Sequence, residues 1–272
     1  MKRAVLLAMI GIMTCCVGAG SALATTLNIN GSTTVLPIAQ KVGEAYSKAH
    51  PEVNVTIAGT GSGNGIKAVI DGMTDIGMSS RWIREGEVKL AFENGKYVVP
   101  FAVALDAIIP VVHPDNPVSD LTLEQLRGIY NGKISNWKEV GGPDRRIASI
   151  SRDSSSGTYG VWVDTVLKGD RIGPRSQLLP SNGAIVQAVS NNPFAIGYVG
   201  IGYLRDGLKP LSIGGVAPSY ENAQSGAFPV SRTLWMFTDN WPDGERLRFI
   251  NFLLHPQKGQ PLVKESGYVP LY

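Results

Sequence analysis

The sequence predicts an α/β fold of two lobes, each a mostly parallel sheet flanked by helices, with a ligand cleft between the lobes. Strand-like and helix-like patterns alternate along the chain, which is typical of parallel sheets covered by helices. The 272 residues are 43% hydrophobic, enough for one large domain or for two lobes with separate cores. No linker separates independent domains, so we expect crossing strands near 101–110 and 198–213. Lobe 1 then comprises 25–103 and 206–272, and lobe 2 comprises 104–205.

In the first half of the chain, helical patterns follow the short strand patterns. After the second strand, Ile66, Val69 and Ile70 recur at the i, i+3 and i+4 spacing of an amphipathic helix. The last strand pattern of this half is long, apolar and β-branched, as suits a strand that crosses between lobes. The strands expected here are 25–29, 53–59, 75–80 and 97–113.

The second half continues the alternation. A helix should end at Gly132, because glycine is favoured just after a helix. Trp162 and Val166 belong to the apolar stripe of a later helix. The elements expected here are a helix over 121–132, a strand over 147–151, helices around 159–167 and 182–192, a strand over 195–200, and helices within 244–269.

The N-terminus has the pattern of a secretory signal peptide. A basic start at Lys2 and Arg3 precedes an apolar run over 4–17, and the small residues Ala22 and Ala24 follow. We expect cleavage after Ala24 and export to the periplasm. A buried N-terminal helix is the alternative interpretation of the same run.

Charge and cysteine content exclude several classes of function. Cys15 and Cys16 both lie inside the expected leader, so the mature chain would contain no disulfide and no thiolate ligand for a metal. Without Lys2 and Arg3 the chain keeps 23 basic and 22 acidic residues, a net charge of +1. That balance does not indicate a nucleic-acid partner.

Three loops of similar composition each follow a strand and open a helix. They are NGSTTVLP at 30–37, GTGSGNGIK at 59–67 and SRDSSSGTYG at 151–160. Helix starts leave backbone N–H groups unpaired, and Ser and Thr hydroxyls add further donors. Capping explains any one of these loops by itself. Together they predict a site for a small, multiply charged oxyanion, to which Arg152 adds a guanidinium.

Asp75 is the residue that could choose between oxyanions. Sulfate near neutral pH has only acceptors, whereas monohydrogen phosphate can donate its proton to a carboxylate. A ligand that leaves a buried polar group unpaired is rejected by factors of about 10⁴ to 10⁵. A helix cap or a surface acid is an equally good interpretation of Asp75.

Four motifs, taken together and in this order, resemble those of the phosphate-specific periplasmic binding proteins of ABC transporters: GSTTVLP, GSGNGIKAVIDGMTDIGMSSR, SRDSSSGTYG and FPVSRTLWMF. The resemblance runs from about Thr26 to the end of the chain. It implies a type II periplasmic-binding-protein-like fold that closes on inorganic phosphate and docks on the permease subunits of an ABC importer. It also implies a monomer with no cofactor, no metal and no catalytic residue.

The resemblance assigns ligand contacts to the three loops, one guanidinium and one carboxylate, which accepts the proton of the phosphate. The phosphate-binding residues it implies are Ser32, Thr33, Thr34, Ser62, Asp75, Arg152, Ser156, Gly157 and Thr158.

The chain departs from the family pattern beside Arg152. Some members place an acid two positions after the arginine, where this chain has Ser154, and the acid here is Asp153. Either Asp153 holds the guanidinium from a shifted angle or other groups hold it. Arg81 could add positive potential near the cleft, although a salt bridge is the simpler interpretation.

Two other functions would also use a site for an oxyanion. A receptor for another tetrahedral oxyanion would have the same donors. A phosphoester hydrolase with a serine nucleophile would need Gly-x-Ser-x-Gly, and neither Ser62 nor Ser156 has these flanking glycines.

Overall fold

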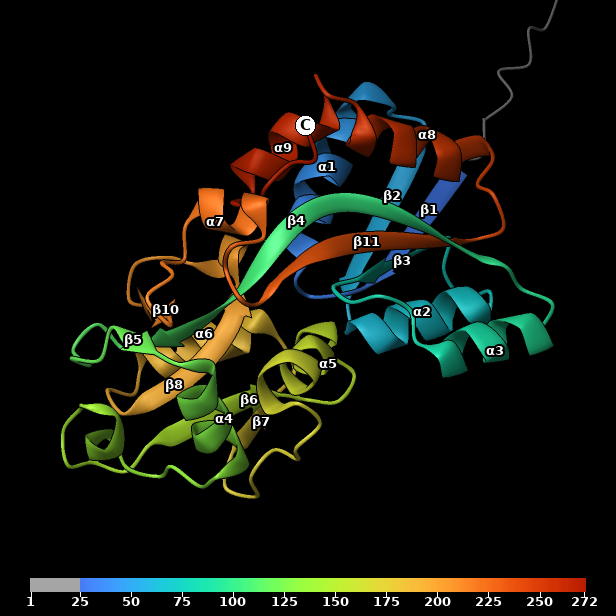
Figure 1. Cartoon of the computed structure of the whole chain (residues 1–272). Helices are drawn as coiled ribbons and strands as arrows, with labels where there is room; N and C mark the ends of the chain where they lie inside the picture. The colour runs from blue at the N-terminus through green and yellow to red at the C-terminus, as the bar shows by residue number, and fades with distance from the viewer. Residues whose placement is uncertain (1–24) are drawn as a thin grey trace, which may run out of the picture.

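The computed structural model describes residues 25–272, so the expected leader, its cleavage site after Ala24 and both cysteines lie outside the described residues. Within the described part, one nine-stranded sheet extends through the whole molecule (Figure 1). Its main path follows the order β2-β1-β3-β11-β4-β8-β6-β7, and β9 pairs with β4. Two large hydrophobic cores form along this sheet.

The N-terminal body comprises residues 25–104 and 234–268, whose apolar side chains pack into the same core. Helices α1, α8 and α9 contact one another and supply this core, while α2 and α3 pack around a smaller apolar cluster. The elements are β1 (Thr25–Gly31), α1 (Leu36–Ala49), β2 (Val53–Gly59), α2 (Ser62–Ile70), β3 (Ile76–Ser79), α3 (Glu85–Glu93), α8 (Gly244–Leu254) and α9 (Gly259–Glu265). Strands β1, β2 and β3 are parallel.

The central body comprises residues 107–230, which form the second core. An aromatic group stabilises it: Trp162 stacks on Tyr198 with ring centroids 4.2 Å apart, and Tyr130 packs edge-on against both. The elements are β5 (Asp120–Leu121), α4 (Leu123–Asn131), β6 (Ala148–Arg152), α5 (Gly157–Trp162), β7 (Gln177–Leu179), α6 (Asn182–Ser190), β8 (Ala195–Gly200), β9 (Lys209–Pro210), β10 (Ser212–Ile213) and α7 (Tyr220–Ser225). One π-helical turn over Val163–Leu167 extends α5.

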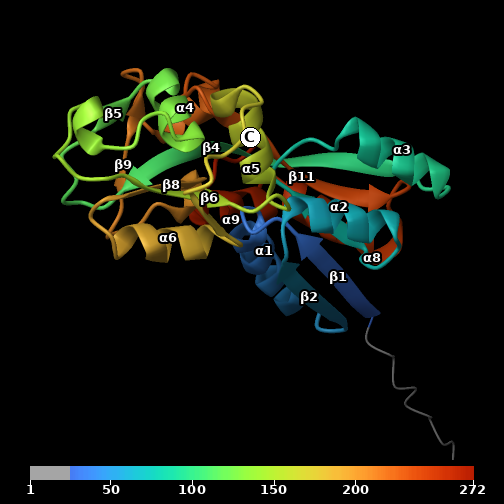
Figure 2. The same cartoon turned by 90° about the horizontal axis from the view of Figure 1, so that it is seen from below.

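Two long antiparallel strands join the bodies, β4 (Val98–Val112) and β11 (Ser231–Asp239). Figure 2 shows the N-terminal and central bodies on either side of them. The second crossing is therefore β11 and not 198–213. Residues 208–230, which the sequence analysis assigns to lobe 1, pack in the central core because β9 pairs with β4 there.

The α/β class with flanking helices is confirmed, and the strands within each body are largely parallel. The exceptions lie in the middle of the sheet, where β11 runs antiparallel to β3 and β4, and β4 runs antiparallel to β8 and β9. Among residues 25–272, no helix combines the length and the apolar character needed to cross a bilayer.

Candidate functional site

The three loops that the sequence singles out meet between the two bodies. Each follows the carboxyl end of a parallel strand, β1, β2 or β6, and such ends are where α/β sheets bind ligands. A fourth segment, after β3, joins them. The buried hydroxyl residues brought together are Ser32, Thr33, Thr34, Ser62, Ser80, Ser156 and Thr158.

The first loop turns directly out of β1 into α1. Ser32 Oγ accepts hydrogen bonds from the backbone N–H groups of Thr34 at 3.1 Å and Val35 at 3.4 Å. The Ser32 N–H donates to the Met78 carbonyl at 2.9 Å, which ties this loop to β3. Ser32 therefore caps the turn with its oxygen and retains its hydroxyl proton for donation.

The second loop depends on a glycine. Gly61 precedes α2 with φ +107°, a conformation that side chains rarely adopt, and its backbone packs against Ser155. Next to it, Ser62 Oγ accepts the Ser80 N–H at 3.0 Å and lies 3.3 Å from Ser80 Oγ. The Gly63 N–H donates to the Ser155 carbonyl at 2.9 Å, so this loop contacts the central body.

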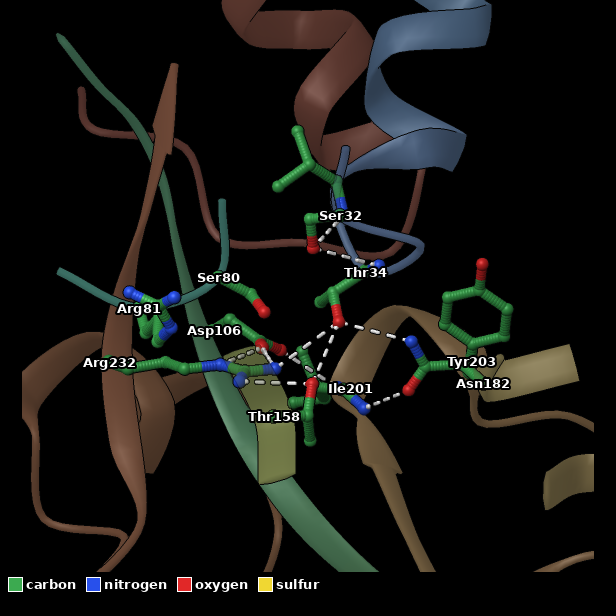
Figure 3. Close-up of polar contacts among 12 residues, drawn as sticks. Ser32, Thr34, Ser80, Arg81, Asp106, Thr158, Asn182, Ile201, Tyr203 and Arg232 are labelled. Carbon is green, nitrogen blue, oxygen red and sulfur yellow. Dashed lines mark hydrogen bonds and ion pairs between the residues drawn. The ribbon is translucent and has the colours of Figure 1, made fainter. Parts of the chain in front are cut away.

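The third loop brings the central body against the first two. Ser156 caps α5 by accepting the Tyr159 N–H at 3.3 Å. Thr158 Oγ1 lies 3.0 Å from Thr34 Oγ1, across the boundary between the bodies (Figure 3). Gly157 packs so closely that a Cβ added there would lie 2.5 Å from Ser62 Oγ. The structure thus brings residues 32–34, 62 and 156–158 together.

Arg152 supplies the charge in this region. It is 1% exposed, and its Nε and Nη2 donate to the carbonyls of Leu179 at 3.1 Å and Pro180 at 2.8 Å. Within the described part of the chain, its Nη1 is buried without a hydrogen-bond partner. Burial lowers the pKa of Arg152, and the charge of Asp153 opposes this only in part. An unpartnered N–H group of this kind is available to an anionic ligand.

The carboxylate beside Arg152 is engaged elsewhere. Asp153 Oδ1 accepts from the backbone N–H of Ser155 at 2.8 Å and from its hydroxyl at 2.5 Å. Of the two alternatives for this position, the structure therefore supports the second: main-chain carbonyls hold the guanidinium.

Asp75 lies outside this cluster, which corrects the role expected for it. Its Oδ2 accepts from the backbone N–H of Asn28 at 2.8 Å and from the Asn28 side-chain amide at 3.3 Å. Asp75 precedes β3, whereas the cluster follows β3, so about 13 Å of strand separates them. The Asp75 side chain lies at the opposite end of β3 from the cluster. Ser80 directly follows the end of β3 that faces the cluster.

Arg81 forms the salt bridge considered for it. Its guanidinium makes a two-fold contact with Glu87, at 2.8 and 2.6 Å, and is 8% exposed. This contact lowers the pKa of Glu87 against the opposing effect of burial.

Sequence reasoning missed a second polar layer beneath the hydroxyls. Asp106 and Arg232 form a buried ion pair, with Nη2 to Oδ2 at 2.7 Å. Asn182 donates to Thr34 Oγ1 at 3.0 Å, and the Tyr203 hydroxyl donates to the Thr33 carbonyl at 2.5 Å. Burial raises the pKa of Tyr203 to about 12, so the phenol keeps its proton at neutral pH. The only signal for Arg232 was its place within FPVSRTLWMF.

The site offers hydrogen-bond donors and little apparatus for bond cleavage. Ser62 and Ser156 contact Ser80 and a backbone N–H, not a general base. Among residues 25–272, no group of three or more His, Cys, Asp or Glu side chains could hold a metal ion.

A sheet shared by two bodies, with buried donors where the bodies meet, defines the class of two-lobed α/β ligand-binding proteins. In agreement with this, the family described as the PBP superfamily domain matches residues 17–257. The chain is 34% identical over 255 residues to the phosphate-binding protein PstS of Borreliella burgdorferi, covering 89% of each chain. It is 30% identical to PstS of Bacillus subtilis, covering 90% of this chain and 81% of the relative.

A solved structure agrees in both sequence and fold. It is a protein from Clostridium perfringens described as a phosphate ABC transporter substrate-binding protein with bound phosphate. The TM-score is 0.85 at 33% identity, covering 91% of this chain and 100% of that chain. The chain belongs to the PBP superfamily and, within it, to the family of PstS phosphate-binding proteins.

Proposed function

We propose that this protein binds inorganic phosphate in the periplasm and delivers it to the permease subunits of an ABC importer. The observation that carries the proposal is the buried Arg152 guanidinium at the start of the third loop, whose Nη1 has no hydrogen-bond partner among residues 25–272. Its relatives in Borreliella burgdorferi and Bacillus subtilis are named phosphate-binding proteins, and the solved Clostridium perfringens relative holds phosphate. The protein acts as a monomer and makes or breaks no covalent bond.

The ligand contacts come from hydroxyl and backbone donors with one formal positive charge. Hydrogen bonds between such donors and an anion are charge-assisted and therefore stronger than neutral ones. Partial desolvation of a dianion is costly, so almost all of its oxygens must be paired in the closed form. The contacts proposed are those of Ser32, Thr33, Ser62, Ser80, Arg152, Ser156, Gly157 and Thr158, with Thr34 acting through Thr158.

Contacts across the boundary between the N-terminal and central bodies indicate how the ligand is enclosed. Thr34 meets Thr158, and Gly63 donates to Ser155, so both bodies contribute to one polar cluster. A ligand that binds this closed arrangement better than an open one drives closure. Closure then provides the signal by which a permease can distinguish loaded from empty receptor.

One observation favours a second candidate, a receptor that also takes sulfate. The nearby carboxylates among residues 25–272 are engaged by protein groups, since Asp106 pairs with Arg232 and Asp153 Oδ1 accepts from Ser155. The acceptor proposed for a ligand proton is then a hydroxyl oxygen, such as that of Ser62 or Ser80. A hydroxyl can donate or accept, so it does not repel sulfate as a carboxylate would.

Calorimetric titration of the purified protein tests the proposal. We expect one phosphate bound per chain and, at a phosphate concentration about 100 times Kd, stabilisation by about 2.7 kcal/mol. That stabilisation raises Tm by roughly 5–10 °C for a chain of this size. Sulfate, added as a competitor, should displace phosphate. A site in which a carboxylate faces the ligand would repel sulfate and would keep its phosphate at the same sulfate concentration. No heat of binding and no rise in Tm with phosphate would exclude the proposed function.

A further inference from the structure

An ion pair on the two crossing strands lies directly beneath the threonines that close the site. Asp106 on β4 and Arg232 on β11 are opposite one another in the antiparallel register. Asp106 is 0% exposed and the Arg232 side chain is 5% exposed. Arg232 Nε donates to Asp106 Oδ2 at 2.8 Å, and Nη2 approaches the same oxygen at 2.7 Å. The pair therefore fixes the direction of the guanidinium.

The remaining donors of Arg232 point at the threonine pair (Figure 3). Nη1 donates to Thr158 Oγ1 at 3.1 Å, and Nη2 donates to Thr34 Oγ1 at 3.5 Å. One of these threonines belongs to the N-terminal body and the other to the central body. A single guanidinium on a crossing strand thus contacts both sides of the site.

Asn182 completes the set of donors to Thr34. Its Oδ1 accepts the Gly200 N–H at 3.3 Å, so its Nδ2 faces the threonines and donates to Thr34 Oγ1 at 3.0 Å. The neighbouring Ile201 N–H donates to Asp106 Oδ1 at 2.9 Å. Asn182 and Asp106 are therefore both held where β8 ends, by its last residue and by the residue that follows it.

These contacts determine which way the threonine protons point. A hydroxyl has one proton to donate and two lone pairs to accept with. Thr34 Oγ1 accepts from Asn182 and from Arg232, so its proton goes to Thr158 Oγ1, 3.0 Å away. Thr158 Oγ1 then accepts from both Thr34 and Arg232, and its own proton finds no acceptor among the hydrogen bonds of residues 25–272.

We infer that the Asp106–Arg232 pair is a positioning device, which forces the hydroxyl of Thr158 to donate into the site. Arg232 does this without being a ligand itself, through the oxygens of Thr34 and Thr158. An anion with oxygen acceptors gains a pre-oriented donor, and the ligand does not have to reorganise the hydroxyl network when it binds. The inference rests on the proposed binding of phosphate and names the residues that set its donor geometry.

A purely structural role is the competing explanation, because removing one partner of any buried ion pair destabilises a protein. The two explanations differ in coupling. If Arg232 only supports the fold, its loss and the loss of the Thr158 hydroxyl weaken phosphate binding independently. If Arg232 orients that hydroxyl, the hydroxyl contributes little once Arg232 is altered.

The test is a double-mutant cycle on phosphate affinity, measured by calorimetry with Arg232→Lys, Thr158→Val and the double variant. Lysine keeps the charge opposite Asp106, so the protein should fold, but its one nitrogen cannot also reach both threonines. We expect Thr158→Val to weaken binding about 10-fold in the parent and less than about 2-fold beside Arg232→Lys, a coupling of at least about 5-fold.

Arg81 provides the matched control. It is also buried and paired with a carboxylate, but it makes no hydrogen bond to either threonine. The effects of Arg81→Lys and Thr158→Val should multiply within about 2-fold. Multiplicative effects in the Arg232 cycle as well would overturn the inference and leave phosphate binding intact. A parent protein that binds no phosphate would overturn the proposed function and this inference together.

Discussion

Replacing Arg152 with methionine weakens phosphate binding by at least about 30-fold and leaves the ligand-free protein about as stable as the parent. Among residues 25–272 the guanidinium has no salt-bridge partner, and burial lowers its pKa against the partial opposition of Asp153, so the empty site bears the cost of an incompletely compensated charge. Phosphate supplies the missing charge. Truncating one side of such a buried charge pair costs about 2–5 kcal/mol, or roughly 30- to 5,000-fold in affinity.

The measurement is a phosphate titration of the Arg152→Met variant, together with thermal unfolding in the absence and presence of phosphate. Methionine fills a similar volume with an unbranched apolar chain. The free energy of unfolding of the variant without phosphate should stay within about 1 kcal/mol of the value for the parent. The phosphate-induced rise in Tm should disappear. Arg127→Met is a matched control in the same body, because Arg127 pairs with Asp170 outside the site. Phosphate affinity within about 3-fold of the parent for Arg152→Met would remove Arg152 from the site.

Replacing Gly157 with alanine keeps the bodies from closing on the ligand. The added Cβ would lie 2.5 Å from Ser62 Oγ and 2.7 Å from Ser80 Oγ, both on buried side chains of the opposite body. Overpacking of this kind costs about 1–3 kcal/mol, so phosphate affinity should fall roughly 5- to 150-fold. The clash lies between the bodies and not within either core, so the free energy of unfolding without phosphate should change little.

Small-angle scattering adds a readout that affinity alone does not give. The radius of gyration of the parent should decrease when phosphate is added, whereas that of Gly157→Ala should not. Gly86→Ala makes the same chemical change in the first turn of α3, where a Cβ meets nothing within 4 Å, and it should behave like the parent. Normal closure and affinity in the Gly157→Ala variant would show that this contact does not limit closure.

The elements with clear periodicity could be predicted from the sequence. The alternation from β1 to β3 and the helices α4 and α6 follow from apolar spacing and from capping residues such as Thr122 and Ser181. The gathering of three Ser- and Thr-rich loops could also be foreseen, because each follows a parallel strand and such ends meet at one edge of a sheet.

The position of Asp75 was mispredicted, although the sequence held the correct signal. Ligand sites in α/β sheets lie at the carboxyl ends of strands, and Asp75 precedes its strand. Ser79 and Ser80, at the other end of the same strand, were the better candidates. The motif runs from Asp75 into the strand, so Asp75 lies at the amino end of that strand. This position alone excludes its carboxylate from the expected ligand set.

The ion pair between Asp106 and Arg232 could not be predicted from one sequence. The partners are 126 positions apart, and they meet only because β11 returns antiparallel beside β4 in one register. Residues 231–239 lack the simple alternation that identifies a half-buried strand, because Met236 and Phe237, which point to opposite faces of the sheet, are both buried. The boundary expected at 206 was wrong for the same reason: the return strand was not recognised.

A crystal structure of the protein grown with phosphate tests the central claim most directly. That claim is that hydroxyl and backbone donors from both bodies, with one buried guanidinium, enclose a tetrahedral oxyanion. We expect one phosphate within hydrogen-bonding distance of Arg152 Nη1 and of the hydroxyls of Ser62 and Thr158, with Asp75 still bound to Asn28. A phosphate bound elsewhere, or one in contact with Asp75 and not with Arg152, would contradict it.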